Sequence, residues 1–401
     1  MQFEKVLSRK FGEGEYKFYL SISVVTRSRI WHLPQFSLEW LSRLHRACPS
    51  VFLDNNLFKE QCKYNRLCLL LKSLLTFASQ FIIGMKVTEH IDNAKGNTLF
   101  SIEVLPPQKG KTIDDLLKVI EPLMEFKPPF IDVTYHREET IYKKRADGLI
   151  EEIPLRKRPG TVGICAAIKG RFNVDTVPHL VCGGFTPEET EDALFTLHYL
   201  GINNVLLLQG DQDKNAKSTY KLSAYKYASD LVKQVSDMNK GKFLHEETEA
   251  EMKTNFCIGV AAYPEKHFES PNLNTDLKWL KHKVECGADY IVTQMFFDNR
   301  KYFEFVDKCR AAGITIPIIP GLKPIAQKSQ LSTLARIFHI DMPEDLANAV
   351  ENCADDKAVK RVGIEWCITQ SQELKAANVP CLHYYTMSRS EATIEIAKAV
   401  F

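Results

Sequence analysis

The chain has 401 residues, of which 45% are hydrophobic and 25% are charged, and its formal net charge is +2. These proportions are ordinary for a globular protein and exclude a collagen-like or disordered chain. The small net charge gives no general attraction to nucleic acid, so we expect no nucleic-acid partner. The length suits two or three average domains, or one α/β barrel with an added segment.

The first 84 residues differ from the remainder. They hold 12 of the 52 basic residues but only 6 of the 50 acidic ones, and their aromatic residues follow no sustained period. The segment ends in an apolar run, Leu67 to Gly84, which is about long enough to cross a bilayer but contains Lys72. We expect residues 1–84 to be an irregular extension and Met85 to be the natural start; an organellar presequence and a membrane anchor are the alternatives.

From residue 85 onward, short apolar runs alternate with amphipathic segments. Continuous runs of this kind are typical of parallel strands that are covered on both faces. The eight runs occupy residues 99–105, 130–136, 174–182, 203–211, 256–265, 289–298, 315–324 and 381–387. Eight strands that alternate with helices predict a (β/α)8 TIM barrel, so residues 85–401 form a single catalytic domain without a membrane segment.

The intervening segments carry helix signals. One helix is expected to begin after Thr186 as N-cap, with Pro187 in its first turn and Glu189 completing a capping box, and to stop at Gly201. The segment 112–126 has an apolar helical period. Two further helices are expected to end at Gly287 and Gly313. The mixed-charge segment 143–160 reads as a solvated loop.

Two kinds of site receive no support from the residue pattern. No G-x-G-x-x-G turn follows the first strand, so a bound dinucleotide would lack the Rossmann fingerprint. The histidines lack metal-site spacing and the eleven cysteines form no C-x-x-C pair, so we expect no metal. Reduced cysteines packed as small apolar side chains indicate a cytoplasmic protein.

A glutamate stands inside the first apolar run, in the segment FSIEVLPP, where it is Glu103. A buried carboxylate without a partner is costly, so such a residue usually has a partner or a task. Other polar side chains also follow the predicted strands, at the barrel end where active sites are found. They include Thr134, His179, Gln209, Asp211, Tyr263, His267, Gln294 and Arg389. Each has a structural explanation when it is taken alone, but their convergence favours an active site.

Nine segments carry a family resemblance in chain order. They are FSIEVLPP, VTY, PHLVC, LLLQGD, YASDLV, VAAYPEKH, VTQMFFD, IIPGLKP and HYYTMSR. Together they closely resemble the methylenetetrahydrofolate reductase family over essentially all of residues 85–401. The resemblance implies a barrel that binds FAD. The flavin would be reduced by NADH or NADPH and would then reduce 5,10-methylenetetrahydrofolate to 5-methyltetrahydrofolate in a ping-pong reaction that supplies methionine synthesis.

The resemblance also implies roles for individual residues. Glu103 matches the general acid that protonates N10 of the folate, and Asp211 matches the second catalytic carboxylate, near the flavin and the pterin. Gln294, Gln330 and Arg389 match substrate-binding positions. The positions that match FAD contacts are Thr134, His179, Gln209, Gly210, Asp211, Tyr227, Ala228, Tyr263, His267, Asp276 and Lys283. Lys283 and His267 are the natural partners of the diphosphate.

Two departures accompany the resemblance. The family often has arginine where this chain has Gln209, which removes one cation near the flavin. The chain ends shortly after the eighth strand, so it resembles the bacterial, barrel-only form, which tends to use NADH and to form homo-oligomers. A flavin-free folate-binding methyltransferase and a non-catalytic barrel subunit are the alternative functions.

Overall fold

The computed structural model describes residues 84–136, 139–210, 225–246, 251–387 and 389–401, together with four strands within residues 2–37. The chain divides into two compact units, Met1–Leu75 and Thr76–Phe401. None of the helices in the described part of the chain combines the length and apolar character of a membrane span.

The first unit contains a small antiparallel sheet. Its longest pairing joins β1 to β2, from Gln2↔Val25 to Lys10↔Lys17, and β2 also pairs with β3 and β4. The strands are β1 (Gln2–Lys10), β2 (Lys17–Thr26), β3 (Arg29–His32) and β4 (Phe36–Ser37). Most of the apolar run predicted as a possible anchor, residues 67–83, lies outside the described residues.

The second unit is a closed parallel barrel, and it confirms the eight predicted strands. Its strands are β5 (Leu99–Val104), β6 (Phe130–Val133), β9 (Asp175–Val181), β10 (Asn204–Leu208), β11 (Cys257–Ala262), β12 (Tyr290–Thr293), β13 (Ile318–Ile319), β14 (Gly321–Leu322) and β15 (Cys381–Tyr385). They are ordered β13-β12-β11-β10-β9-β6-β5-β15-β14. Pro320 has no N–H to donate and divides the seventh strand into β13, which pairs with β12, and β14, which pairs with β15. The two halves therefore close the ring.

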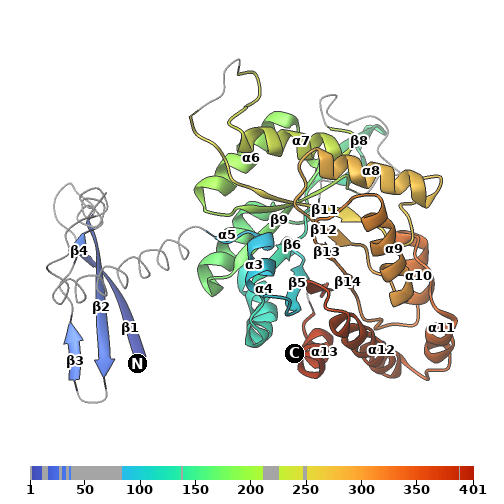
Figure 1. Cartoon of the computed structure of the whole chain (residues 1–401). Coiled ribbons are helices and arrows are strands. Elements are labelled where there is room, and N and C mark those ends of the chain that lie inside the picture. The colour runs from blue at the N-terminus through green and yellow to red at the C-terminus, as the bar shows by residue number, and fades with distance from the viewer. Residues whose placement is uncertain are drawn as a thin grey trace. The chain divides into compact units, whose positions relative to one another are not determined.

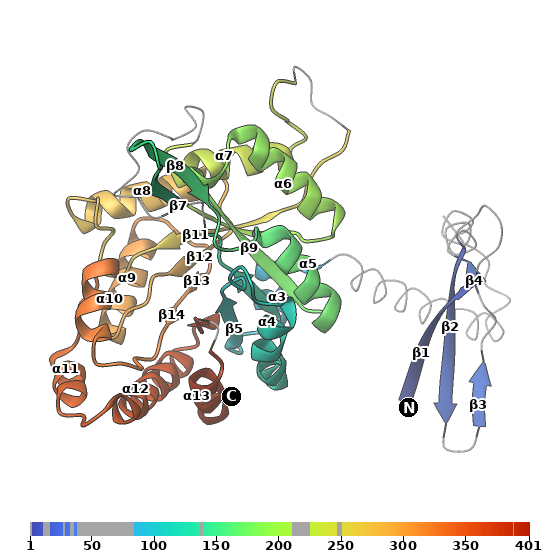
Figure 2. The same cartoon turned by 180° about the vertical axis from the view of Figure 1, so that it is seen from behind.

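Helices surround the strands in both views of the cartoon (Figures 1 and 2). They are α4 (Ile113–Ile120), continued by the 3-10 helix η1 (Glu121–Phe126), α5 (Thr161–Phe172), α6 (Pro187–Tyr199), α7 (Ala228–Asn239), α8 (Leu273–Glu285), α9 (Asn299–Ala311), α10 (Gln330–Phe338), α11 (Glu344–Glu351), α12 (Asp356–Ala376) and α13 (Glu391–Val400). A short 3-10 turn, η2 (Cys182–Gly184), follows β9. The capping box predicted for α6 is present: Thr186 Oγ1 accepts from the Glu189 amide, and Glu189 Oε2 accepts from the Thr186 amide.

The barrel interior is apolar at the end where the strands begin. Phe130, Val177, Leu206 and Tyr290 belong to one buried cluster there. A Cβ at Gly259 would collide with the Tyr290 ring, so the glycine provides the space that the ring fills. This packing leaves the opposite end of the barrel for polar groups.

The segment 143–160 was predicted to be a loop, and this prediction was wrong. It contains most of an antiparallel hairpin, β7 (Glu139–Lys144) with β8 (Ile150–Leu155), whose turn includes Gly148 at φ +84°. Charged residues pair across the hairpin, with Lys143 opposite Glu151. Because charges occupy both strands, no apolar alternation marks the strands in the sequence.

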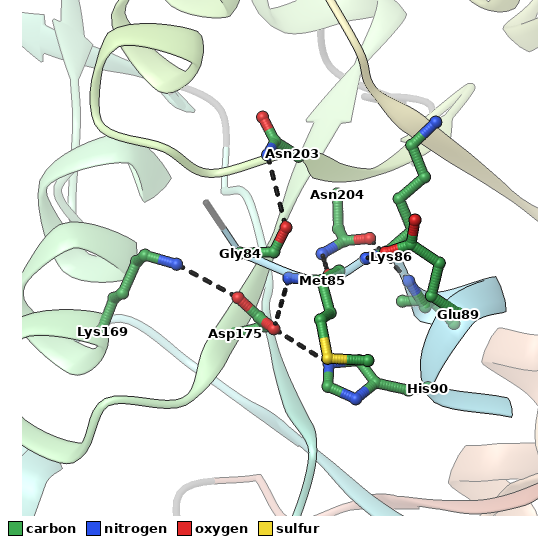
Figure 3. A network of polar contacts seen from close by, with 10 residues as sticks. Gly84, Met85, Lys86, Glu89, His90, Lys169, Asp175, Asn203 and Asn204 are labelled. Carbon is green, nitrogen blue, oxygen red and sulfur yellow. Dashed lines mark hydrogen bonds and ion pairs between the residues drawn. The ribbon is translucent and has the colours of Figure 1, made fainter. Parts of the chain in front are cut away.

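The chain enters the barrel through a polar anchor at Met85 (Figure 3). The Met85 amide donates to Asp175 Oδ2 at 2.9 Å, and Lys169 Nζ donates to Asp175 Oδ1 at 3.1 Å. His90 Nε2 lies 2.9 Å from the same Oδ2, and Asn204 both accepts from the Val87 amide and donates to the Met85 carbonyl. These contacts fix the start of α3 (Val87–Asn93) against the barrel.

The charge of Asp175 depends on these partners. Burial raises the pKa of Asp175, but the hydrogen bonds and charges of His90 and Lys169 outweigh it, so the pKa lies below its ordinary value. A carboxylate with a lowered pKa stabilises the fold above its unfolded pKa, and this contribution is lost as the pH falls through the folded pKa.

We predict that Asp175→Ala lowers the free energy of unfolding by about 2 kcal/mol at neutral pH, because the partly buried Met85 amide and the Lys169 ammonium lose their acceptor. Urea denaturation measures the change, with Asp92→Ala on the exposed face of α3 as control. The loss should shrink in acid as the wild-type carboxylate takes up a proton. Equal effects of the two substitutions at neutral pH would contradict the anchor.

Candidate active site

Three titratable side chains meet inside the barrel where β5, β6 and β9 approach their carboxyl ends. His179 Nε2 lies 3.2 Å from Asp132 Oδ2 and 3.8 Å from Glu103 Oε2. Their side chains are 4%, 1% and 14% exposed, respectively. Glu103 and Asp132 are register partners in the parallel pair of β5 and β6, which is why both carboxyl groups face the same interior.

Burial sets the protonation of this cluster. Desolvation raises the pKa of Glu103 to about 7, with the neighbouring His179 lowering it and Asp132 raising it further. Desolvation also raises the pKa of Asp132 to about 7, against the charge of His383. The pKa of His179 is lowered by burial, with Glu103 opposing the shift. A carboxylic acid that can donate a proton near neutral pH is therefore present at the barrel mouth.

A second interior pair lies beside this cluster. Ser101 Oγ lies 2.8 Å from His383 Nδ1, and Ser101 and His383 are register partners on β5 and β15. Within the described part of the chain, Asp132 Oδ1 and His383 Nε2 are buried without a hydrogen-bond partner. The barrel therefore keeps unused hydrogen-bonding capacity next to Glu103.

The predicted substrate residues come from the last three strands and their loops. Gln294 follows β12. Its backbone amide donates to the Ala262 carbonyl at 2.8 Å, and its side-chain Oε1 accepts from the Met295 backbone amide. Gln330 opens α10, and its Oε1 accepts from the amide of Ala326 at 2.7 Å. Arg389 follows β15 and is exposed. These three residues therefore occupy separate loops after the ends of the strands.

Four predicted cofactor residues form one cluster beyond β11. Asp276 Oδ2 in the first turn of α8 accepts from the His267 amide at 2.9 Å. The rings of His267 and Tyr263 meet edge to face with centroids 4.6 Å apart. Lys283 Nζ donates to the Ala261 carbonyl at 2.6 Å. Burial lowers the pKa of Lys283 to about 8, against the opposing charge of Asp276.

The other predicted cofactor residues lie around the same end of the barrel. Thr134 Oγ1 lies 3.1 Å from His136 Nε2 just after β6. Gln209 follows β10 and donates to Glu269 Oε2 at 3.3 Å, and Gly210 has φ +84°. Ala228 begins α7. Asp211, the predicted second catalytic carboxylate, lies outside the described residues.

Tyr227, the N-cap residue of α7, presents an exposed aromatic ring. Tyr227 is 49% exposed. Its ring stacks on that of Trp279 in α8, with a centroid distance of 6.4 Å and an interplanar angle of 13°, and Lys226 Nζ lies 5.0 Å from the Tyr227 ring centroid. An exposed aromatic face together with the nearby helix α8, which carries the ammonium of Lys283, offers stacking and charge. Such a donor set fits a dinucleotide, which has planar rings and an anionic diphosphate.

The sequence reasoning missed three interior residues: Asp132, His383 and Lys323. Asp132 stands in the apolar run FIDV, so it carries the same signal that drew attention to Glu103. Lys323 follows β14 and is only 8% exposed. In the sequence, Lys323 could have been found as a charged residue at the end of the apolar run 315–324.

The sequence model of the family described as methylenetetrahydrofolate reductase matches residues 86–400. "Methylenetetrahydrofolate reductase 1" of Schizosaccharomyces pombe is 32% identical over 77% of this chain and 47% of its own length. "Methylenetetrahydrofolate reductase (NADH) 1" of Arabidopsis thaliana is 31% identical over 78% of this chain and 50% of its own length. The chain thus spans about half the length of these relatives. "5,10-methylenetetrahydrofolate reductase" of Escherichia coli is 29% identical over 77% of this chain and 93% of its own length.

Glu103 should destabilise the fold above neutral pH. Its folded pKa of about 7 exceeds the ordinary value of 4.5, so the folded protein retains a proton that the unfolded chain releases between these two pH values. Stability due to this group therefore falls as the pH rises through this window.

We predict that Glu103→Gln removes this loss. The variant should exceed the wild type in free energy of unfolding by about 2 to 3 kcal/mol at pH 8 and should match it near pH 4. Urea denaturation at both pH values measures the difference, and the exposed residue Glu125 provides the control Glu125→Gln. If the difference in free energy of unfolding between Glu103→Gln and the wild type is the same at pH 8 as at pH 4, the pKa of Glu103 is not raised.

Proposed function

The chain belongs to the methylenetetrahydrofolate reductase family, and we propose that it reduces 5,10-methylenetetrahydrofolate to 5-methyltetrahydrofolate with electrons from a reduced nicotinamide dinucleotide. The observation that carries the proposal is the buried Glu103 carboxyl, whose pKa of about 7 suits proton donation. The relatives from S. pombe, A. thaliana and E. coli, which are named for this activity, support it. We assign the activity to residues 85–401.

Glu103 acts as the general acid in the proposed reaction. The five-membered ring of the folate must open before its methylene carbon can accept hydride. The proton leaves the Glu103 carboxyl oxygen for N10, and the bond between the methylene carbon and N10 breaks with its electron pair passing to N10. The methylene carbon is left as a 5-iminium cation that is open to hydride. A carboxyl with an ordinary pKa would already be ionised at neutral pH and could not supply this proton.

His179 holds the carboxylate that remains. Because burial keeps its imidazole neutral, an Nε2–H directed between Asp132 and Glu103 can donate to either carboxylate, and at 3.8 Å it needs only a small movement to reach Glu103. Asp132 orients the ring, as the carboxylate partner of a catalytic histidine does. In the proposal these residues stabilise the product of proton transfer.

The remaining substrate roles follow the residues matched in sequence. Asp211 contributes negative charge that stabilises the iminium cation and binds the pterin edge. Gln294 binds the pterin and also contacts the nicotinamide, while Gln330 and Arg389 hold other parts of the folate. NADH is the co-substrate to test first, because the A. thaliana relative is named for it. The proposal includes the methionine pathway as the destination of the product.

FAD is the cofactor in this proposal. When bound, it would supply the two-electron carrier between the nicotinamide and the folate that a ping-pong reaction requires. Lys283 and His267 would bind its diphosphate, and the exposed ring of Tyr227 would pack on one of its planar rings. Thr134, His179, Gln209, Gly210, Asp211, Ala228, Tyr263 and Asp276 complete the proposed set.

We also propose a cytoplasmic location and a homo-oligomer. The location is supported by the eight cysteines among the described residues, all of which are free thiols. Five of them are fully buried and packed among apolar side chains in the described barrel: Cys165, Cys257, Cys309, Cys367 and Cys381.

We predict that the purified protein binds FAD and is yellow. Anaerobic NADH should bleach the flavin absorbance, and methylenetetrahydrofolate should restore it. Glu103→Gln should keep the first half-reaction and slow the second by about 100-fold or more, since it removes the general acid. Glu125→Gln should change neither.

Other outcomes would overturn this function. A protein that cannot be loaded with FAD, yet transfers the methyl group of 5-methyltetrahydrofolate, would be a flavin-free methyltransferase. A flavoprotein without turnover would be a non-catalytic subunit. Loss of both half-reactions in a folded Glu103→Gln variant would contradict the role of Glu103.

We predict that Lys283→Met weakens FAD binding by about tenfold or more, because the diphosphate loses a charge-assisted donor. Quenching of flavin fluorescence on binding measures the dissociation constant without any turnover. Lys281→Met is the matched control, since Lys281 is exposed on the same helix. Equal dissociation constants for both variants would contradict the assignment.

A further inference from the structure

Lys323 is a buried lysine that the proposed reaction does not yet use. It follows β14 and is 8% exposed. Its ammonium makes no hydrogen bond or ion pair with any residue in the described part of the chain. Lysine is almost never buried without a partner, so this position requires an explanation.

The strand register places Lys323 on the interior face at the level of Glu103. Leu322 pairs with Tyr384, and both belong to the apolar cluster between the strands and the helices. The next residue on each strand, Lys323 and Tyr385, therefore faces the barrel interior. Tyr385 is the register partner of Glu103. Lys323 and Glu103 thus lie two strands apart, roughly 10 Å between backbones, a distance that the long lysine side chain shortens.

Few charged groups face this pair. His179 and Asp132 lie beside Glu103 on the neighbouring strands, and Arg389 acts on Lys323 from the loop after β15. Tyr385 lies between the two strands, and its hydroxyl donates to the Thr293 carbonyl at 2.6 Å. Burial keeps this phenol neutral by raising its pKa well above the ordinary value. After His179, Lys323 is the other basic group whose charge lowers the pKa of Glu103 against the effect of burial.

The charge of each group shifts the pKa of the other: Lys323 lowers that of Glu103, and Glu103 raises that of Lys323. Burial raises the pKa of Glu103 to about 7, and the charge of Lys323 limits this rise. Burial lowers the pKa of Lys323 to about 8, and the charge of Glu103 limits this fall. Near neutral pH a buried carboxylate and a buried ammonium can therefore coexist in the same low-dielectric interior.

We propose that Lys323 is a positioning residue for proton transfer, whose ammonium stabilises the carboxylate that Glu103 becomes when its proton has left for N10. Lys323 itself gives up no proton in this step. Its charge acts at a distance, since the structure contains no direct ion pair between the two side chains. The role in turnover rests on the proposed function, whereas the coupling between Lys323 and Glu103 does not.

The coupling can be measured in the protein without cofactor or substrate. Full-length protein containing lysine labelled with carbon-13 at Cε gives a resonance for Lys323, which is identified by its loss in Lys323→Arg. In wild type this resonance should titrate near pH 8. In Glu103→Gln it should titrate at lower pH, because the carboxylate that favours the ammonium is gone. Glu125→Gln should leave it unchanged.

The reciprocal effect appears in the folate half-reaction. Lys323→Met should shift the alkaline limb of its pH profile upward by roughly one unit, because Glu103 loses its stabilising cation. Lys323→Arg, which keeps the charge, should restore the wild-type limb. Lys357→Met, on the exposed start of α12, is the control. A purely structural role for Lys323 would change the rate or the stability without moving this limb.

The two measurements separate the possible failures. A Lys323 resonance that titrates at the same pH in wild type and Glu103→Gln overturns the inference, whatever the enzyme does. Normal coupling in a protein that does not reduce the folate would overturn the proposed function and leave the coupling intact. An unmoved pH limb in an active, folded Lys323→Met variant would overturn the positioning role.

Discussion

The burial of a carboxyl group in the polar half of a closed barrel is the constraint on which the candidate site depends. Closure of the sheet brings Glu103, Asp132 and His179 from three adjacent strands into one interior that water scarcely enters. In that environment ionisation of either acid is costly, so each keeps its proton to higher pH. The same physical effect that destabilises the fold above neutral pH therefore produces a usable acid.

One end of the barrel contributes mainly to stability, and the other end carries the candidate site. Where the strands begin, Tyr290 fills the space left by Gly259, and the Met85 anchor joins the entering chain to Asp175. At this end the Asp175 carboxylate is paired with Lys169 and accepts a hydrogen bond from the Met85 amide. Where the strands finish, Asp132 and His383 keep buried atoms without partners in the described chain, and the Lys323 side chain is buried as well. Groups left unsatisfied in this way usually mark a site that binds something.

The sequence predicted the strands well because parallel strands covered on both faces must be apolar runs, and all eight runs became strands of the ring. Glu103 could be singled out because a carboxylate interrupts such a run. Asp132 carries the same signal but was passed over, and its contact with His179 exists only once β6 and β9 are neighbours. Lys323 could not be connected with Glu103 along the chain, since 219 intervening residues separate two positions that the closed ring brings to one level. The hairpin of β7 and β8 was missed because its charged residues hide the alternation.

The chemistry proposed for this barrel requires that the Glu103 carboxyl retain its proton near neutral pH. The most direct test is the carbon-13 NMR titration of glutamate labelled at the side-chain carboxyl, with the Glu103 resonance identified by its absence in Glu103→Gln. Because Glu103 and Asp132 share His179, the curve reports the coupled group, and the Asp132→Asn variant separates the two steps. We expect a main transition near pH 7. A single transition near the ordinary glutamate value of 4.5 would contradict it.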